Sequence, residues 1–352
     1  MKYSPIPVRK SVEKMRPYHP PLEGRTNKLR LDFNENPIGC SPAVRRALAK
    51  LSAASISAYP EQETLRNRAA RYFGVRPDEL LLTNGTDEAL SLVVSVFVEP
   101  ADRVLLVEPT YAMYRFYAEL AAARIVALRY NDDMQFPLAR VLEELRTGPR
   151  VFFLPNPNSP TGALLSFREL RRILQAAERT MVIIDEAYFE FSGVTVIPWI
   201  QRHRNLIVTR TFSKTCGLAG LRLGCVFVRR ELAAQMRKAQ SPYPVNAAAL
   251  AAAEAAIHDR AFIRRTVGEV IRARKELQNG LTRLGIRHFP SAGNFVLAYF
   301  GDRVRSVVSA LERKNILVRD RSSDFGGQGY VRITVGTLAQ TRRLLRELKA
   351  IA

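Results

Sequence analysis

A single lysine, Lys214, follows a predicted buried strand and has phosphate-binding residue types around it. The apolar, β-branched run Leu206–Thr209 predicts that strand, and a hydroxyl-rich turn containing Thr211 and Ser213 leads to the lysine. No other lysine occurs between Lys50 and Lys214, although arginine is frequent there. An amine can lose its proton and form a Schiff base, which a guanidinium cannot. The residue type at this position therefore suggests chemistry.

The residues around Lys214 indicate which chemistry. Arg222 follows the lysine by eight residues in a glycine-spaced segment. Together with Thr211 and Ser213 it supplies donors that suit a phosphate group. A Schiff-base lysine beside a phosphate-binding group is the combination that pyridoxal phosphate (PLP) requires. Taken alone, Lys214 would more often be an ordinary surface lysine on a loop, and the neighbouring residues reverse that interpretation.

The elements that must position these residues alternate between strand and helix from Leu80 onward, a pattern that favours a parallel α/β sheet. The expected strands are 80–82, 104–107, 125–128, 151–154, 181–184, 206–209 and 225–228, followed by 294–299, 316–318 and 330–335. The expected helices are 41–51, 89–98, 231–240, 304–313 and 338–348, one that ends near Tyr72 and an alanine-rich one that ends at His258. Residues 1–30 are proline-rich and are expected to form a mostly irregular arm.

The segment from Ser213 to Gly224 resembles the lysine motif of fold-type I, class-II PLP-dependent aminotransferases, in particular the histidinol-phosphate aminotransferases. The resemblance extends from Tyr18 to Arg332, nearly the whole chain. It implies a large, mostly parallel, seven-stranded α/β/α domain, a smaller α/β domain and a homodimer with shared active sites. The expected division is an arm and part of the small domain at 1–50, the PLP-binding domain at 51–259 and the small C-terminal domain at 260–352.

Further motifs carry the resemblance to the cofactor site. The run Asn84-Gly85-Thr86-Asp87-Glu88 matches a family motif, and a glycine turn at a helix N-terminus suits a phosphate. The resemblance implies that Gly85, Thr86, Asp87, Thr211, Ser213 and Arg222 bind the cofactor, that Tyr111 stacks on the pyridine ring, and that Tyr59 reaches the cofactor phosphate of the partner subunit.

Asp185 ends the predicted strand 181–184, and Tyr188 follows it by three residues. A carboxylate that keeps the pyridine nitrogen protonated lets the ring draw electrons from the substrate. The resemblance gives this role to Asp185 and gives Tyr188 a hydrogen bond to the cofactor's 3-hydroxyl. The family usually has asparagine directly before Pro-Thr-Gly, bonded to the same hydroxyl, but this chain has Ser159. Ser159 could form a weaker bond, or the neighbouring Asn158 could reach in.

Four residues are implied to bind the substrate, namely Tyr18, Asn36, Arg319 and Arg332. Asn36 belongs to the run Asn34-Glu35-Asn36-Pro37-Ile38-Gly39, which matches the family's Asn-Glu-Asn-Pro-x-Gly signature. Arg332 would grip the α-carboxylate of glutamate or the phosphate of histidinol phosphate with a fork that lysine cannot copy. Arg319 and Tyr18 would add phosphate contacts.

The resemblance predicts the reaction L-histidinol phosphate plus 2-oxoglutarate to imidazole acetol phosphate plus L-glutamate, within histidine biosynthesis. Lys214 would move the proton of the substrate Cα, Asp185 and Tyr188 would assist, and the two half-reactions would follow a ping-pong scheme. An aromatic amino acid aminotransferase and a threonine-phosphate decarboxylase of the same fold remain alternatives. The signature around Asn36 favours the histidinol-phosphate branch over the decarboxylase.

Composition restricts the other classes. The chain has 352 residues and a net charge of +21. Its arginines are scattered over predicted helices without a basic tail, which disfavours a nucleic-acid-binding protein. No apolar run reaches the length of a membrane span, and the N-terminus lacks a signal core. The three cysteines lack metal-ligand spacing, so we expect no metal, reduced thiols and a cytoplasmic location.

Overall fold

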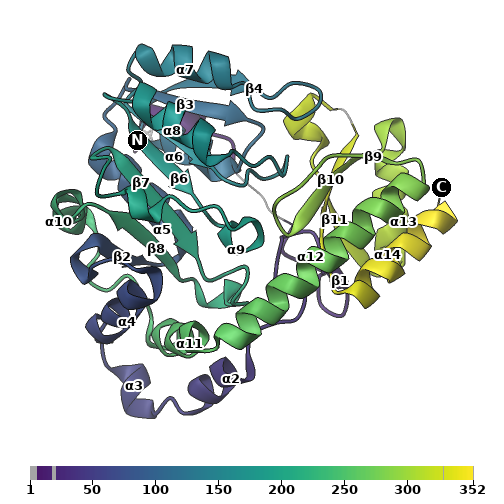
Figure 1. The fold of residues 1–352 in the computed structure, drawn as a ribbon, viewed down its shortest axis with the longest axis horizontal. Coiled ribbons are helices and arrows are strands. Elements are labelled where there is room, and N and C mark those ends of the chain that lie inside the picture. Colours follow the sequence, from purple (N-terminus) through teal and green to yellow (C-terminus); the bar gives the residue numbers. More distant parts are fainter. Residues whose placement is uncertain (1–5, 18–20, 328, 352) are drawn as a thin grey trace, which may run out of the picture.

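Two β-sheets organise the chain in a computed structural model that describes residues 6–17, 21–327 and 329–351 (Figure 1). The larger sheet has seven strands in the order β2-β8-β7-β6-β5-β3-β4, and only the pairs that include β8 are antiparallel. Its strands are β2 (Leu80–Thr83), β3 (Arg103–Glu108), β4 (Arg124–Arg129), β5 (Val151–Pro155), β6 (Met181–Asp185), β7 (Leu206–Thr211) and β8 (Gly224–Val228). The predicted mostly parallel, seven-stranded sheet is confirmed.

Helices cover both faces of this sheet, which explains the near-continuous apolar runs of its strands. Successive residues of one strand join different core clusters, because side chains alternate across a sheet. Phe152 belongs to the core cluster that includes residues of α4 (Glu63–Phe73), α7 (Leu138–Arg146), α8 (Phe167–Ala176) and α11 (Ala247–His258). Phe153 belongs to the cluster on the opposite face, with residues of α5 (Gly85–Phe97), α6 (Ala112–Leu120) and α10 (Arg230–Ala239).

The second sheet, at the right of Figure 1, has five strands in the order β1-β11-β12-β10-β9. These are β1 (Leu29–Leu31), β9 (Arg287–His288), β10 (Phe295–Tyr299), β11 (Ile316–Asp320) and β12 (Tyr330–Thr334). Its core is closed by α12 (Arg260–Arg283), α13 (Val304–Arg313) and α14 (Leu338–Ile351). Because β1 pairs in parallel with β11, the N-terminal segment and the C-terminal part of the chain share one sheet.

The remaining helices are short. The arm contains α1 (Lys10–Lys14) and contacts α6, where Arg9 donates a 3.0 Å hydrogen bond to the carbonyl of Leu120. Two further short helices are α3 (Ala53–Ser57) and α9 (Phe189–Ser192). Helix α2 (Pro42–Ala49), capped by the hydroxyl of Ser41, buries Val44 in the core of the larger sheet. The division of the chain at residues 50 and 259 stays a prediction.

The first turn of α5 corrects the sequence interpretation. The helix was expected from residue 89, but it begins at Gly85. Asp87 and Glu88 lie in its first turn, where acidic side chains interact favourably with the helix dipole. Within the described ranges, no helix is long and apolar enough to span a membrane.

Candidate active site

The predicted site residues gather at one edge of the larger sheet, where its parallel strands have their carboxyl ends. Asp185 ends β6, Lys214 follows β7, and Ser159 lies in the loop after β5. Tyr111 follows β3, and Gly85 follows β2. In open α/β sheets this edge is where ligands bind.

Lys214 lies between the two sheets. Its Nζ donates a 3.2 Å hydrogen bond to the carbonyl oxygen of Phe33, in the segment that follows β1. The same nitrogen lies 5.9 Å from the centroid of the Tyr188 ring. The amine is therefore close to the aromatic side chain that the resemblance assigned to the same site.

Asp185 is a buried carboxylate with two hydrogen-bond donors. Its Oδ2 accepts from the hydroxyl of Tyr114 at 2.7 Å, and its Oδ1 accepts from the backbone N–H of Ala187 at 3.1 Å. Burial raises the pKa of Asp185, although the hydrogen bonds oppose that shift. A buried carboxylate of this kind is stabilised by a nearby cation, such as a protonated pyridine nitrogen. Tyr114 was not predicted, although it lies one helical turn after Tyr111.

Arg222 lies over the N-terminal turn of α5. Its Nη2 is 3.0 Å from Oδ2 of Asp87. A Cβ atom at Gly85 would collide with the Arg222 guanidinium, and one at Gly224 would lie 2.7 Å from the carbonyl carbon of Gly85. Both glycines are thus required for the close approach of this arginine to the helix terminus. A guanidinium beside the free N–H groups of a helix N-terminus suits a phosphate.

The other predicted phosphate-site residues are linked locally. The hydroxyl oxygen of Thr211 accepts a 3.0 Å hydrogen bond from the backbone N–H of Ser213, which orders the turn before Lys214. Tyr111 donates a 2.8 Å hydrogen bond to Oδ1 of Asp87 and lies edge-on to Tyr114. Asp87 therefore joins Tyr111 to the arginine at the start of α5, where Thr86 also lies.

Asn158 and Ser159, the two candidates for the hydrogen bond that the family's asparagine makes to the cofactor, have different partners in the loop after β5. Asn158 is buried, and its side-chain amide bonds to Thr110, Thr161 and the carbonyl of Pro109 at 2.8, 2.8 and 3.0 Å. Its amide therefore fixes the loop. The hydroxyl oxygen of Ser159 accepts a 3.0 Å hydrogen bond from Nη1 of Arg332.

Arg319 and Arg332 are register partners on the antiparallel strands β11 and β12. Two positive charges directly opposite each other in a sheet repel and destabilise it. An anion bound beside Arg319 and Arg332 would offset that repulsion. The Arg319 guanidinium carbon lies 5.6 Å from the centroid of the Phe33 ring, close to the segment that contacts Lys214. Arg332 also donates to the backbone carbonyl of Asp32.

Two of the predicted residues, Asn36 and Tyr59, have other surroundings. The amide of Asn36 bonds to the carbonyl of Thr215 at 2.8 Å and to the N–H of Ile38 at 2.9 Å, so it ties its segment to the lysine loop. Tyr59 is 76% exposed and stacks on Tyr243 with ring centroids 4.2 Å apart. Tyr18 lies outside the described residues.

Asn34 is a second residue that the sequence interpretation missed. Its Nδ2 donates a 2.9 Å hydrogen bond to the hydroxyl oxygen of Tyr188. The sequence showed only that it belongs to the Asn-Glu-Asn-Pro signature, which predicted a turn. No signal in the sequence connects it with Tyr188, 154 residues away.

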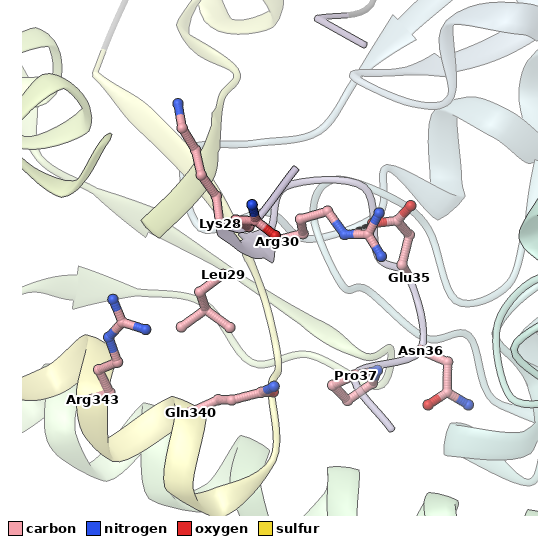
Figure 2. Close-up of a pocket in the computed structure, with 9 residues that line it drawn as sticks. Lys28, Leu29, Arg30, Glu35, Asn36, Pro37, Gln340 and Arg343 are labelled. Carbon is pink, nitrogen blue, oxygen red and sulfur yellow. Dashed lines mark ion pairs between the residues drawn. The ribbon is translucent and has the colours of Figure 1, made fainter. Parts of the chain in front are cut away.

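A cavity of about 380 Å³ lies beside the run Asn34–Gly39, and neither Lys214 nor Asp185 lines it (Figure 2). Its cations bond to protein groups: Lys28 pairs with Glu312, and Arg30 extends to Glu35. Arg343 donates to the carbonyl of Lys314. These three cations of the cavity therefore already have protein partners.

The donor set at the sheet edge fits a phosphorylated pyridine aldehyde. Lys214 offers an amine, Asp185 a buried carboxylate, and Arg222 with the start of α5 an anion site. Among the described residues, no group of His, Cys, Asp and Glu side chains could hold a metal ion. The arrangement therefore suits carbonyl–amine chemistry assisted by fixed charges.

The chain is similar to known proteins over nearly its whole length. A family model described as aminotransferase class I and II matches residues 26–348. The histidinol-phosphate aminotransferase of Symbiobacterium thermophilum is 38% identical over 97% of this chain and 98% of that protein. The enzyme of the same name from Caldanaerobacter subterraneus is 35% identical over 94% and 95%.

A solved structure extends the likeness to the fold. The histidinol-phosphate aminotransferase from Sinorhizobium meliloti, determined in complex with pyridoxal-5′-phosphate, superposes with a TM-score of 0.84 at 26% identity over 92% of this chain and 90% of that one. Since the family model spans nearly the whole chain and the relatives match it end to end, this chain belongs to the class I and II aminotransferase family.

Proposed function

We propose that the chain is a PLP-dependent aminotransferase that converts L-histidinol phosphate and 2-oxoglutarate into imidazole acetol phosphate and L-glutamate, in histidine biosynthesis. The names of the relatives support the reaction. The observation that carries the substrate class is the facing pair Arg319 and Arg332 on β11 and β12. One donor has a phosphate and no carboxylate, and the other has two carboxylates. Arg332 would bind the anionic end of both donors, and Arg319 would add a contact to the phosphate.

The residues would divide the work as follows. When bound, PLP would draw into its ring the electrons that are left on the substrate Cα when the Cα–H bond is broken. Lys214 carries the amine that holds the cofactor and moves that proton. Asp185 stabilises a proton on the pyridine nitrogen, and the positive end of α5 with Arg222 holds the phosphate. Thr86, Thr211 and Ser213 would add donors to the same phosphate.

Arg332 would position the anionic end of each substrate. Its bond to Ser159 orients the guanidinium, which then offers a planar fork to a carboxylate or phosphate. Arg319 would contact the phosphate of histidinol phosphate together with Tyr18. Asn36 would act near the substrate through the lysine loop to which it is bonded.

The proposal includes a homodimer in the cytoplasm, with small molecules rather than nucleic acid as ligands. Tyr59 and Tyr243 form a stacked pair in which both rings are exposed, at 76% and 56%. Exposed stacked aromatic rings suit an interface. In the dimer, Tyr59 would reach the cofactor phosphate of the partner subunit.

The test is a comparison of kcat/KM for L-histidinol phosphate and phenylalanine, with 2-oxoglutarate as acceptor. The proposal predicts a clear preference for histidinol phosphate, since phenylalanine lacks the phosphate that Arg319 would bind. A preference for phenylalanine would favour the aromatic aminotransferase. Release of carbon dioxide from threonine phosphate would favour the decarboxylase.

A further inference from the structure

We propose that Asn34 sets the direction of the Tyr188 hydroxyl, so that Tyr188 donates its proton to the 3-oxygen of the cofactor. The inference deepens the proposed function, because it rests on the proposed roles of Lys214 and Tyr188. It does not depend on which amino donor the enzyme uses. Asn34 is a positioning residue in this account, since it acts through Tyr188.

The contact is buried and short. Asn34 is 1% exposed and Tyr188 is 9% exposed. Nδ2 of Asn34 lies 2.9 Å from the Tyr188 hydroxyl oxygen. A hydrogen bond that a buried amide fails to make costs free energy, so all partners of the Asn34 amide together determine its orientation.

Thr334 of β12 fixes which end of the Asn34 amide faces Tyr188. The backbone N–H of Asn34 lies 2.9 Å from the Thr334 hydroxyl oxygen and can only donate. The Thr334 proton is therefore available to Oδ1 of Asn34, which lies 3.1 Å away. With Oδ1 accepting from Thr334, the NH₂ group is the end that reaches Tyr188.

The consequence for Tyr188 follows from its single proton. A phenol has one O–H donor and can also accept. Because Asn34 donates to the oxygen of Tyr188, the Tyr188 proton is directed to a different acceptor. The 3-oxygen of the cofactor is the acceptor that the proposed site places there.

Asn34 itself is held firmly. Its carbonyl oxygen accepts a 3.0 Å hydrogen bond from the side chain of Asn294, and its φ of 55° is a left-handed conformation that asparagine tolerates. Arg25 forms ion pairs with Asp32 and Glu35, which flank Asn34 in the sequence, at 2.9 and 2.8 Å. Arg30 also reaches Glu35, as Figure 2 shows.

The direction of the Tyr188 proton has particular weight in this chain. The family's usual asparagine is replaced by Ser159, whose hydroxyl oxygen accepts from Arg332. Ser159 keeps its own proton and would add a weaker bond to the 3-oxygen, so Tyr188 would be the stronger donor to that oxygen. The neighbouring residue of Asn34, Phe33, bonds to Lys214, so one short segment contacts both groups.

The test is a pH titration of the visible spectrum of the holoenzyme, which reports the pKa of the Lys214–cofactor linkage. A donor to the 3-oxygen weakens the attraction of that oxygen for the linkage proton and so lowers this pKa. Tyr188→Phe should raise it by about one unit. Asn34→Asp should raise it by a similar amount, because a carboxylate accepts and draws the Tyr188 proton to itself. Asn34→Gly, which permits the same φ, should give a smaller rise.

A double variant separates this effect from the added charge of the aspartate. In the Tyr188→Phe background, Asn34→Asp should add little further shift, because Asn34 acts through the missing hydroxyl. The charged groups of the site, namely Asp87, Asp185, Arg222, Arg319 and Arg332, are the same in all variants. Thermal unfolding of each variant checks that the fold is retained.

Three outcomes would overturn the inference. The pKa could stay unchanged in both Asn34→Asp and Asn34→Gly, or Asn34→Asp could shift it equally in the Tyr188→Phe background. If the pKa still rises as expected in Tyr188→Phe, either result would exclude the positioning role of Asn34 and leave the proposed function intact. An unchanged pKa in Tyr188→Phe would contradict the proposed contact of Tyr188 and this inference with it.

Discussion

Arg332 of the second sheet donates a 3.0 Å hydrogen bond to the hydroxyl oxygen of Ser159, at the carboxyl end of β5 in the larger sheet. The two residues are 173 positions apart in the sequence, and their bond joins the two sheets at the candidate active site. The residue in which the chain departs from its family thus contacts the proposed substrate clamp.

Ser159→Ala should therefore affect substrate binding more than cofactor binding. Loss of one hydrogen bond that orients Arg332 should raise KM for both amino donors by about 3- to 10-fold, which corresponds to roughly 1 kcal/mol. The affinity for PLP, measured by fluorescence titration of the apoenzyme, should change little. Weaker PLP binding with an unchanged KM would instead place the Ser159 hydroxyl on the cofactor.

The fold was largely predictable because buried strands leave a strong signal. All strands of the larger sheet except the edge strand β4 are largely buried, so each of them contains an apolar run, as β5 illustrates. The short strands β1 and β9, of three and two residues, lack such a run, and they form only because β11 and β10 offer edges to pair with. The 24-residue helix α12 was also missed, since its buried stripe includes Thr266, Ala273 and Gly280 among many charged residues.

The site was predictable by residue type but not by contact. Lys214, Asp185 and Arg222 stand at strand ends or glycine turns that the sequence marks. The contacts of Asn34 and Tyr114 depend on packing between distant segments, which no local pattern encodes. The bond between Ser159 and Arg332 has the same origin.

The clamp itself can be tested by two arginine variants. Arg332→Lys keeps the charge but loses the planar fork, so kcat/KM should fall for glutamate and histidinol phosphate alike, by about 1.5–3 kcal/mol in transition-state free energy. Arg319→Ala should lower the rate with histidinol phosphate and leave glutamate nearly unaffected. Single-turnover conversion of the bound cofactor by each donor gives both comparisons. Equal losses for the two donors in Arg319→Ala would exclude a phosphate-selective role for Arg319.

The shared active site can be tested by subunit mixing. Tyr59→Phe and Lys214→Ala chains should each be poorly active alone. A mixed dimer should contain one site free of both changes, so activity should partly return when the two proteins exchange subunits. Native mass spectrometry would verify the exchange. Proven exchange without recovered activity would place Tyr59 outside the partner's site.

Replacement of Asp185 by asparagine should maintain or raise the stability of the apo form and lower the transaminase activity. Burial raises its pKa above the ordinary 3.8, so the folded chain without cofactor holds this proton more tightly than the unfolded chain. Its contribution to folding is therefore most favourable below pH 3.8 and is lost as the pH rises through the raised pKa. Asp185→Asn removes the buried charge, and Tyr114 can accept from the new amide.

We therefore expect the apo form of Asp185→Asn to be at least as resistant to urea as the wild type at neutral pH, with a difference that grows as the pH rises above 3.8. Its transaminase activity should fall by roughly 100-fold or more, since the proton on the pyridine nitrogen is no longer stabilised. The matched control is Glu119→Gln on the surface of α6. A destabilised apoenzyme with normal activity would argue for a structural role of Asp185.

Transamination of L-histidinol phosphate can be observed directly in the absorbance spectrum of the purified holoenzyme, when this donor is added without any 2-oxo acid. We expect the donor to convert the bound aldehyde cofactor to its amine form in a single turnover, and 2-oxoglutarate to restore the original spectrum. Lys214→Ala should show no conversion and no cofactor fixed to the chain by borohydride. An unchanged wild-type spectrum with histidinol phosphate, together with conversion by phenylalanine, would contradict the proposed substrate.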